Sequence, residues 1–240
     1  MDDLIEISPA LDRAALAAEF GKRGRLQVRD VLTAASAEKL RTVLIEQVPW
    51  GLACQAGAET PPRLIRAEQL ANVPPAELRR LAAGAAADTA YGFAYHSYPL
   101  VTAYLERWAP GSAMAQLLEE LNSPAMLGFM REVTGVAEIV KLDGQATLYA
   151  PGDFLRLHSD AESERGRRVA YVLNLTLGDW QPHWGGYLNF FDDDGDIELA
   201  FKPRFNSLNL FRVPQWHDVG EVSRAAPLAR YAITGWARDL

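Results

Sequence analysis

Hydrophobic residues recur at two different periods along this chain, and the period changes near residue 135. Before that point, apolar positions are spaced by three and four residues, which is typical of helices with one buried face. Three helices have recognisable start signals: Ser36 before residues 37–47, Pro74-Pro75 before residues 76–87, and Ser123-Pro124 before residues 125–133. We therefore expect residues 1–135 to form a mainly helical scaffold.

From residue 136 onward, short runs rich in β-branched and aromatic residues are separated by Gly, Pro and Asp. The expected strands are residues 138–142, 145–150, 153–158, 168–176, 185–191, 197–202, 207–213, 217–222 and 230–236. Strands at such close spacing indicate a sandwich or barrel. The acidic run 192–196 is interpreted as a hairpin turn between two of them. With no linker or repeat between the halves, we expect one domain, residues 1–240, with helices packed against one side of a β core.

Composition excludes several classes of partner. The net charge is −7 and the isoelectric point is about 5.2, so no basic excess is available to bind nucleic acid. Cys54 is the only cysteine, which rules out an internal disulfide and any zinc or iron–sulfur site built from several thiolates. No signal peptide or membrane-spanning run is recognisable, and we expect a cytoplasmic protein.

One group of residues has the chemistry of a metal site. His158 and Asp160 end a predicted strand, where a period of two directs both side chains to one side. His217 begins a later strand and can supply a third ligand. Two histidines and one carboxylate form a facial triad that leaves coordination positions open, as an iron(II) oxygenase requires, although other divalent metals bind the same ligands. Of the remaining histidines, His183 is interpreted as structural. His96 is interpreted as a polar residue with satisfied hydrogen bonds, and a place near the substrate entrance is the alternative for it.

A second group could bind an anionic cosubstrate. Arg230 opens the strand 230–236, and a guanidinium pairs bidentately with a carboxylate. Thr234 shares its face and could bind the same anion, while Trp236 could form a wall of the cavity against the substrate. Arg224 is the competing cation, but it lies in a turn-like segment.

The order of these motifs resembles the prolyl hydroxylase branch of the 2-oxoglutarate and Fe(II)-dependent dioxygenases. The matching elements, within residues 145–238, are YAPGDF at 149–154, HSD at 158–160, RRVAYVLNLTLGDW at 167–180, WGGYLNFF at 184–191, QWHDVGEV at 215–222 and RYAITGW at 230–236. The resemblance implies a double-stranded β-helix, or jelly roll, with the triad at its open mouth. It also implies that Arg230 and Tyr149 bind 2-oxoglutarate.

The resemblance implies the reaction as well. Fe(II), 2-oxoglutarate and O2 would hydroxylate an unactivated C–H bond, with succinate and CO2 as coproducts and ascorbate as a candidate reductant. Where many relatives carry a tyrosine, this chain has Asn174. We expect Asn174 to point inward and donate a hydrogen bond to the oxoacid. The alternative is a buried asparagine whose hydrogen bonds are satisfied by neighbouring backbone. The predicted substrate is a prolyl residue of a protein or peptide; a free amino acid or small metabolite is the alternative, and a metal-binding β-sandwich without catalysis is a third possibility.

Overall fold

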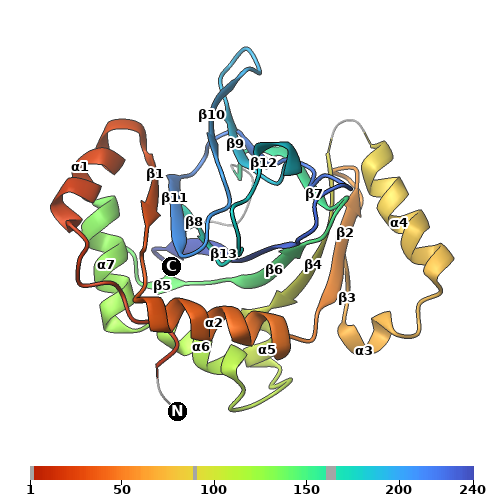
Figure 1. Ribbon diagram of the computed structural model, residues 1–240, viewed down its shortest axis with the longest axis horizontal. Coiled ribbons are helices and arrows are strands. Elements are labelled where there is room, and N and C mark those ends of the chain that lie inside the picture. The colour runs from red at the N-terminus through yellow and green to blue at the C-terminus, as the bar shows by residue number, and fades with distance from the viewer. Residues whose placement is uncertain (1–2, 89–90, 161–165) are drawn as a thin grey trace.

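The computed structural model describes residues 3–88, 91–160 and 166–240 (Figure 1). Its helices are α1 (Arg13–Arg23), α2 (Ala34–Glu46), α3 (Ala67–Leu70), α4 (Pro75–Ala87), α5 (Leu100–Leu105), α6 (Ala113–Leu121) and α7 (Pro124–Thr134), with a short 3-10 helix, η1 (Pro182–Trp184). Its strands are β1 (Arg25–Arg29), β2 (Gly51–Ala56), β3 (Arg63–Ile65), β4 (Gly92–Pro99), β5 (Lys141–Leu142), β6 (Gln145–Tyr149), β7 (Phe154–His158), β8 (Arg167–Asn174), β9 (Leu188–Phe191), β10 (Ile197–Phe201), β11 (Ser207–Arg212), β12 (His217–Val219) and β13 (Arg230–Arg238).

Two of the three predicted helix starts are confirmed. Pro75 is the first residue of α4, and the Ser123 hydroxyl caps α7 by accepting from the Met126 backbone N–H at 3.2 Å. The expected cap at Ser36 is wrong. Thr33 caps α2 instead, and Ser36 lies in the first turn, where its hydroxyl accepts from the Glu6 backbone N–H at 3.0 Å.

The N-terminal half is less exclusively helical than its periodicity predicts, because it also contains β1, β2, β3 and β4. β1 pairs antiparallel with β11, and β4 pairs with both β6 and β7. Strands from residues 1–135 therefore extend the sheet formed by residues 136–240. This shared sheet supports our proposal that residues 1–240 form one domain.

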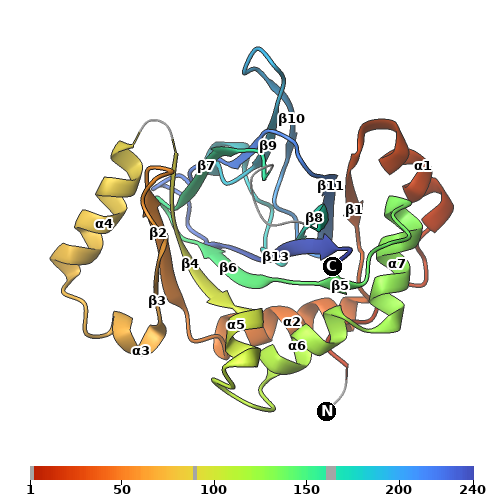
Figure 2. The same cartoon turned by 180° about the vertical axis from the view of Figure 1, so that it is seen from behind.

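The strands follow the order β1-β11-β8-β13-β6-β4-β7-β12-β9-β10, and this path curls into a nearly closed, barrel-like roll (Figure 1). The expected jelly roll with flanking helices is confirmed. Seen from behind, α3 and α4 lie beside β2 and β3, whereas α1 and α7 lie at the opposite edge (Figure 2). The predicted turn at 192–196 is also confirmed, since the Asp192 N–H donates to the Asp196 carbonyl between β9 and β10.

Strand β8 shows how the two faces of the sheet are used. Val169, Tyr171 and Leu173 pack with the helices in the larger apolar core. Ala170 and Val172 point the other way, into a second apolar cluster inside the roll. This alternation follows from the two-residue period of a strand and directs neighbouring side chains of β13 and β6 into the same interior. In the part of the chain described, no helix is long and apolar enough to cross a membrane.

Candidate metal centre

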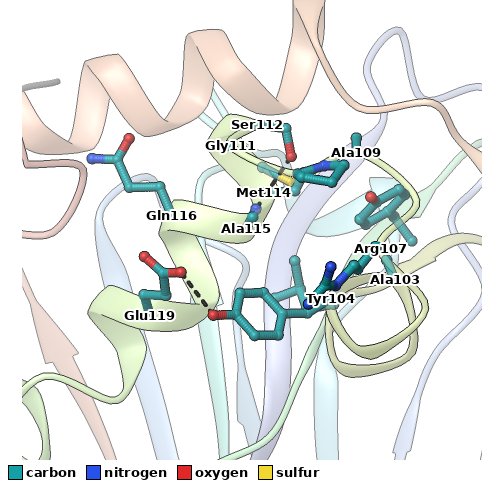
Figure 3. A pocket seen from close by; sticks show the side chains of 13 residues that line it. Ala103, Tyr104, Arg107, Ala109, Gly111, Ser112, Met114, Ala115, Gln116 and Glu119 are labelled. Carbon is teal, nitrogen blue, oxygen red and sulfur yellow. Dashed lines mark hydrogen bonds between the residues drawn. The ribbon is translucent and has the colours of Figure 1, made fainter.

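Two cavities of similar size could hold a ligand. One, of about 500 Å³, lies at α5, α6 and the loop between them. Figure 3 shows its lining, where the Tyr104 hydroxyl donates to Glu119 at 2.8 Å. No histidine, cysteine or aspartate among the described residues lines it, so it has little of the chemistry of an active site. The other cavity, of about 480 Å³, lies inside the roll and is lined by His158, Asp160 and His217.

Strand pairing brings the three predicted metal ligands together. His217 in β12 lies directly opposite His158 in β7, and their ring centroids are 4.1 Å apart. Asp160 lies beyond the end of β7 and has a φ of 61°, so it does not continue the strand as its spacing predicts. Its carboxylate nevertheless converges on both imidazoles: each Nε2 lies 3.8 Å from an Asp160 oxygen. One ligand atom from each residue lies within 4.8 Å of the others.

Backbone contacts orient both imidazoles toward this point. His158 Nδ1 lies 2.9 Å from the Arg156 carbonyl oxygen, and His217 Nδ1 lies 2.7 Å from that of Gln215. A carbonyl can only accept a hydrogen bond, so each Nδ1 carries a hydrogen, and Nε2 is the nitrogen of each ring that can present a lone pair to the cavity. Burial, with the charge of His158 as a second cause, lowers the pKa of His217 to about 4. His217 is therefore neutral near pH 7, as a metal ligand must be.

This donor set fits the metal that the sequence predicts. Two imidazoles and one carboxylate suit Fe(II), and all three residues line the same cavity. His158, Asp160 and His217 could thus hold iron and leave room for further ligands.

Arg230 has the features of an anion-binding residue. Its side chain is 1% exposed and lines the same cavity, and its Nε and Nη1 have no hydrogen-bond partner among the described residues. Burial lowers the pKa of this guanidinium, although arginine keeps its charge in proteins. A buried cation with unused donors is costly unless a ligand pairs with it. The geometry fits a bound carboxylate. Arg224, the competing candidate, is exposed and does not line the cavity.

Of the remaining predicted site residues, some line the cavity and others do not. Tyr149 and Thr234 line the cavity, and the Arg230 guanidinium lies 5.2 Å from the centre of the Tyr149 ring. Asn174 is fully buried but is not among the cavity-lining residues. Its amide nitrogen contacts the backbone of Val172 and Ser207, and its Oδ1 accepts from Arg230 Nη2 at 3.4 Å.

Asn174 therefore matches the backbone-satisfied alternative, and the expected direct bond to the oxoacid is not supported. Trp236 lines the cavity, and its indole N–H donates to Asp160 Oδ2 at 3.0 Å. His96 is satisfied by a 3.2 Å contact with Asp153, and His183, in the 3-10 helix, is exposed.

The sequence interpretation missed a cavity wall formed by β4 and the residue before it. Tyr91, Phe93 and Tyr95 line the cavity, and the Tyr95 ring stacks on Tyr149 with centroids 4.9 Å apart. Burial raises the pKa of Tyr91 to about 12, so its phenol stays protonated at neutral pH. Aromatic residues at positions 91, 93 and 95 have the two-residue period of a strand, which was the signal available. The interpretation also missed Arg167, which lines the cavity from the start of β8.

Comparison with known proteins agrees with this geometry. The model of the 2OG-Fe(II) oxygenase superfamily matches residues 144–238, which include the three clustered residues and Arg230. The predicted resemblance to this superfamily is confirmed over that segment. Enzymes of this superfamily use Fe(II), 2-oxoglutarate and O2. No curated protein matches the chain in sequence.

Solved structures show that the fold extends beyond this segment. A Pseudomonas putida prolyl-4-hydroxylase is 23% identical, with a TM-score of 0.57 over 95% of this chain and 99% of that one. A 2OG-Fe(II) oxygenase family oxidoreductase from Burkholderia pseudomallei is 13% identical, with a TM-score of 0.63 over 100% and 97%. A Trichoplax adhaerens prolyl hydroxylase, in complex with a peptide fragment of the hypoxia inducible factor oxygen degradation domain, is 13% identical, with a TM-score of 0.59 over 95% and 89%. At these identities the likeness establishes the fold alone.

Proposed function

We propose that this chain is a 2OG-Fe(II) oxygenase that hydroxylates a prolyl residue of a protein or peptide. The observation that carries the oxygenase assignment is one cavity that combines a His-Asp-His cluster with a buried arginine, two of whose nitrogens have no hydrogen-bond partner among the described residues. The prolyl substrate is suggested by the structural neighbours, two of which are prolyl hydroxylases, one with a bound peptide. That part of the proposal is an analogy between similar folds.

We assign the metal to His158, Asp160 and His217, each through the atom that faces the cavity. Bound Fe(II), together with 2-oxoglutarate and O2, supplies the oxidation of an unactivated C–H bond, with succinate and CO2 as coproducts. The backbone carbonyls behind both imidazoles place a hydrogen on each Nδ1, so Nε2 is the nitrogen of each ring that can bind a metal.

We assign the distal carboxylate of 2-oxoglutarate to Arg230. Asn174 accepts from one of its five N–H donors, which leaves two N–H groups on one edge of the guanidinium to pair with both carboxylate oxygens, and the surrounding burial strengthens that pairing. Thr234 and Tyr149 lie in the same cavity and are proposed to contact the same molecule. In place of a direct contact, Asn174 is proposed to steady the guanidinium through its amide oxygen.

The test measures succinate formation from 2-oxoglutarate by the iron-loaded protein on exposure to O2, with ascorbate present. His158→Ala is the inactive variant, and His183→Ala is the matched control, because His183 is exposed and does not line the cavity. Iron-dependent succinate from the wild type and His183→Ala, but not from His158→Ala, supports the oxygenase assignment. Equal turnover by His158→Ala would overturn the metal assignment.

Substrate class is tested in the same assay. Proline-containing peptides are expected to stimulate succinate formation and to gain one oxygen atom on proline, measured by mass spectrometry. Stimulation by a free amino acid or small metabolite, with no effect of any peptide, would refute the prolyl proposal and leave the oxygenase assignment intact.

A further inference from the structure

The Tyr95 hydroxyl is a buried hydrogen-bond donor inside the roll. Tyr95 in β4 is 7% exposed and lines the cavity that contains the His-Asp-His cluster. Its oxygen accepts a hydrogen bond from Gln145 Nε2 at 3.3 Å. Ser97 orients this amide, because the Ser97 hydroxyl donates to Gln145 Oε1 at 2.7 Å. Among the described residues Tyr95 forms no other hydrogen bond, so its own hydrogen is available to a molecule in the cavity.

Tyr95 belongs to a row of side chains that joins the two ends of the site. Its ring stacks on Tyr149 with centroids 4.9 Å apart, and the Arg230 guanidinium lies 5.2 Å from the centre of the Tyr149 ring. In the other direction, the row continues through two further aromatic rings to His158, with neighbouring centroids 5.3 to 6.2 Å apart. All of these side chains line the same cavity. A ligand that reaches from Arg230 to the metal cluster therefore passes Tyr95.

The Tyr95 hydroxyl and the Arg230 guanidinium extend in the same direction along β13. Arg230 Nη2 donates to the side chain that faces Ala232 from β8. The Tyr95 hydroxyl bonds to Gln145, which faces Thr234 from β6. Burial raises the pKa of the Tyr95 phenol, so the hydroxyl keeps its proton at neutral pH. A neutral donor and a cationic donor are thus directed toward the same stretch of the cavity.

We propose that Tyr95 donates a hydrogen bond to the carboxylate of 2-oxoglutarate that Arg230 binds, and that Gln145 holds the hydroxyl in place. This inference rests on the proposed function, since it assumes that 2-oxoglutarate occupies the cavity. A carboxylate has enough lone pairs to accept from a hydroxyl as well as from two guanidinium N–H groups. Tyr95 lies outside residues 144–238, the segment that matches the superfamily, so the N-terminal half of the chain supplies this contact.

The test compares Tyr95→Phe with a matched control. Phenylalanine removes the hydroxyl and keeps the ring that stacks on Tyr149. The control is Tyr104→Phe, because the Tyr104 hydroxyl donates to Glu119 at 2.8 Å in the other cavity, at α5 and α6 (Figure 3). Both variants lose one tyrosine hydroxyl, and only Tyr95→Phe loses it inside the roll.

Affinity for 2-oxoglutarate is measured by calorimetry on the protein loaded with Mn(II), which stands in for Fe(II) without oxidation. A hydrogen bond to a charged group corresponds to a factor of about 10 to 100 in affinity, and we expect Tyr95→Phe to lose about that factor. Tyr104→Phe should bind 2-oxoglutarate as the wild type does. Mn(II) affinity should be unchanged in both variants, since neither residue belongs to the metal cluster.

Gln145→Met provides a second measurement. It removes the donor that orients the hydroxyl but keeps the hydroxyl itself, so we expect a smaller loss of 2-oxoglutarate affinity than in Tyr95→Phe. If Tyr95→Phe does not fold, this variant takes its place, and an unchanged affinity would then refute the inference. A merely structural role would lower the melting temperature of the ligand-free variants without changing their affinity for 2-oxoglutarate.

The outcomes separate this inference from the proposed function. If Tyr95→Phe binds 2-oxoglutarate as tightly as Tyr104→Phe does, the inference is overturned and the proposed function stands. Normal 2-oxoglutarate binding by Tyr95→Phe with a raised requirement for peptide would also overturn it, because the hydroxyl would then serve the substrate. No binding of 2-oxoglutarate by the Mn(II)-loaded wild type would refute the proposed function and this inference with it.

Discussion

Replacing Arg230 with methionine removes the guanidinium but keeps most of the side-chain volume. In the proposed complex, two N–H groups on one edge of the guanidinium each donate to a carboxylate oxygen of 2-oxoglutarate, since Asn174 accepts from only one of the five N–H donors. A hydrogen bond to a charged group contributes about 1.5–3 kcal/mol, so the pair contributes about 3–6 kcal/mol. At about 1.4 kcal/mol per tenfold, Arg230→Met should weaken 2-oxoglutarate binding by about 10²- to 10⁴-fold.

The same substitution should not lower the stability of the metal-free protein. Without a bound anion, Arg230 is a buried cation with unused donors, and replacing such a charge with an apolar side chain of similar size is often neutral or stabilising. We therefore expect the melting temperature of metal-free Arg230→Met to equal or exceed that of the wild type. Loss of affinity without loss of stability separates a ligand-binding role from a structural one.

The assay is a calorimetric titration of 2-oxoglutarate into the Mn(II)-loaded protein under anaerobic conditions. Arg224→Met is the matched control, because Arg224 is exposed and does not line the cavity. Mn(II) affinity should be unchanged in both variants, since neither residue belongs to the metal cluster. An affinity of Arg230→Met for 2-oxoglutarate within threefold of the wild type would refute the assignment and move it to another cation.

Three further predictions concern the residues around the cavity. Asp160→Ala should abolish iron-dependent succinate formation while shifting the melting temperature of the metal-free protein by only a few degrees; retained turnover would contradict the ligand set. Asn174→Leu should cost about 1–3 kcal/mol of unfolding free energy in urea and weaken 2-oxoglutarate binding less than Arg230→Met does, because it removes a support and not the contact itself. Phe129→Ala, in the larger core, should cost about 3–5 kcal/mol, yet leave the 2-oxoglutarate affinity of the folded protein unchanged; a parallel loss of affinity would show that the site depends on that core.

The sequence by itself determined the β half of this protein and the identity of its candidate metal ligands. In residues 136–240, alternation of apolar and polar residues is a local signal, since each strand side chain faces opposite to its neighbour. The strands from Gln145 to Trp236 were therefore predicted within a few residues of their observed ends. His158, Asp160, His217 and Arg230 were identified by chemical type and order, which needs no coordinates.

Only the tertiary structure decided how these residues are supported. β1 and β2 are short strands that are stabilised by pairing with strands distant in the sequence. The local pattern of apolar residues does not indicate which strand will pair with them. The side-chain partners were equally undetermined: Asn174 accepts from Arg230 and does not line the cavity, and the Trp236 indole donates to Asp160. Arg167 joined the site because the start of β8 lies beside the end of β13. Each of these contacts joins residues far apart in the chain, so it exists only once the roll has closed.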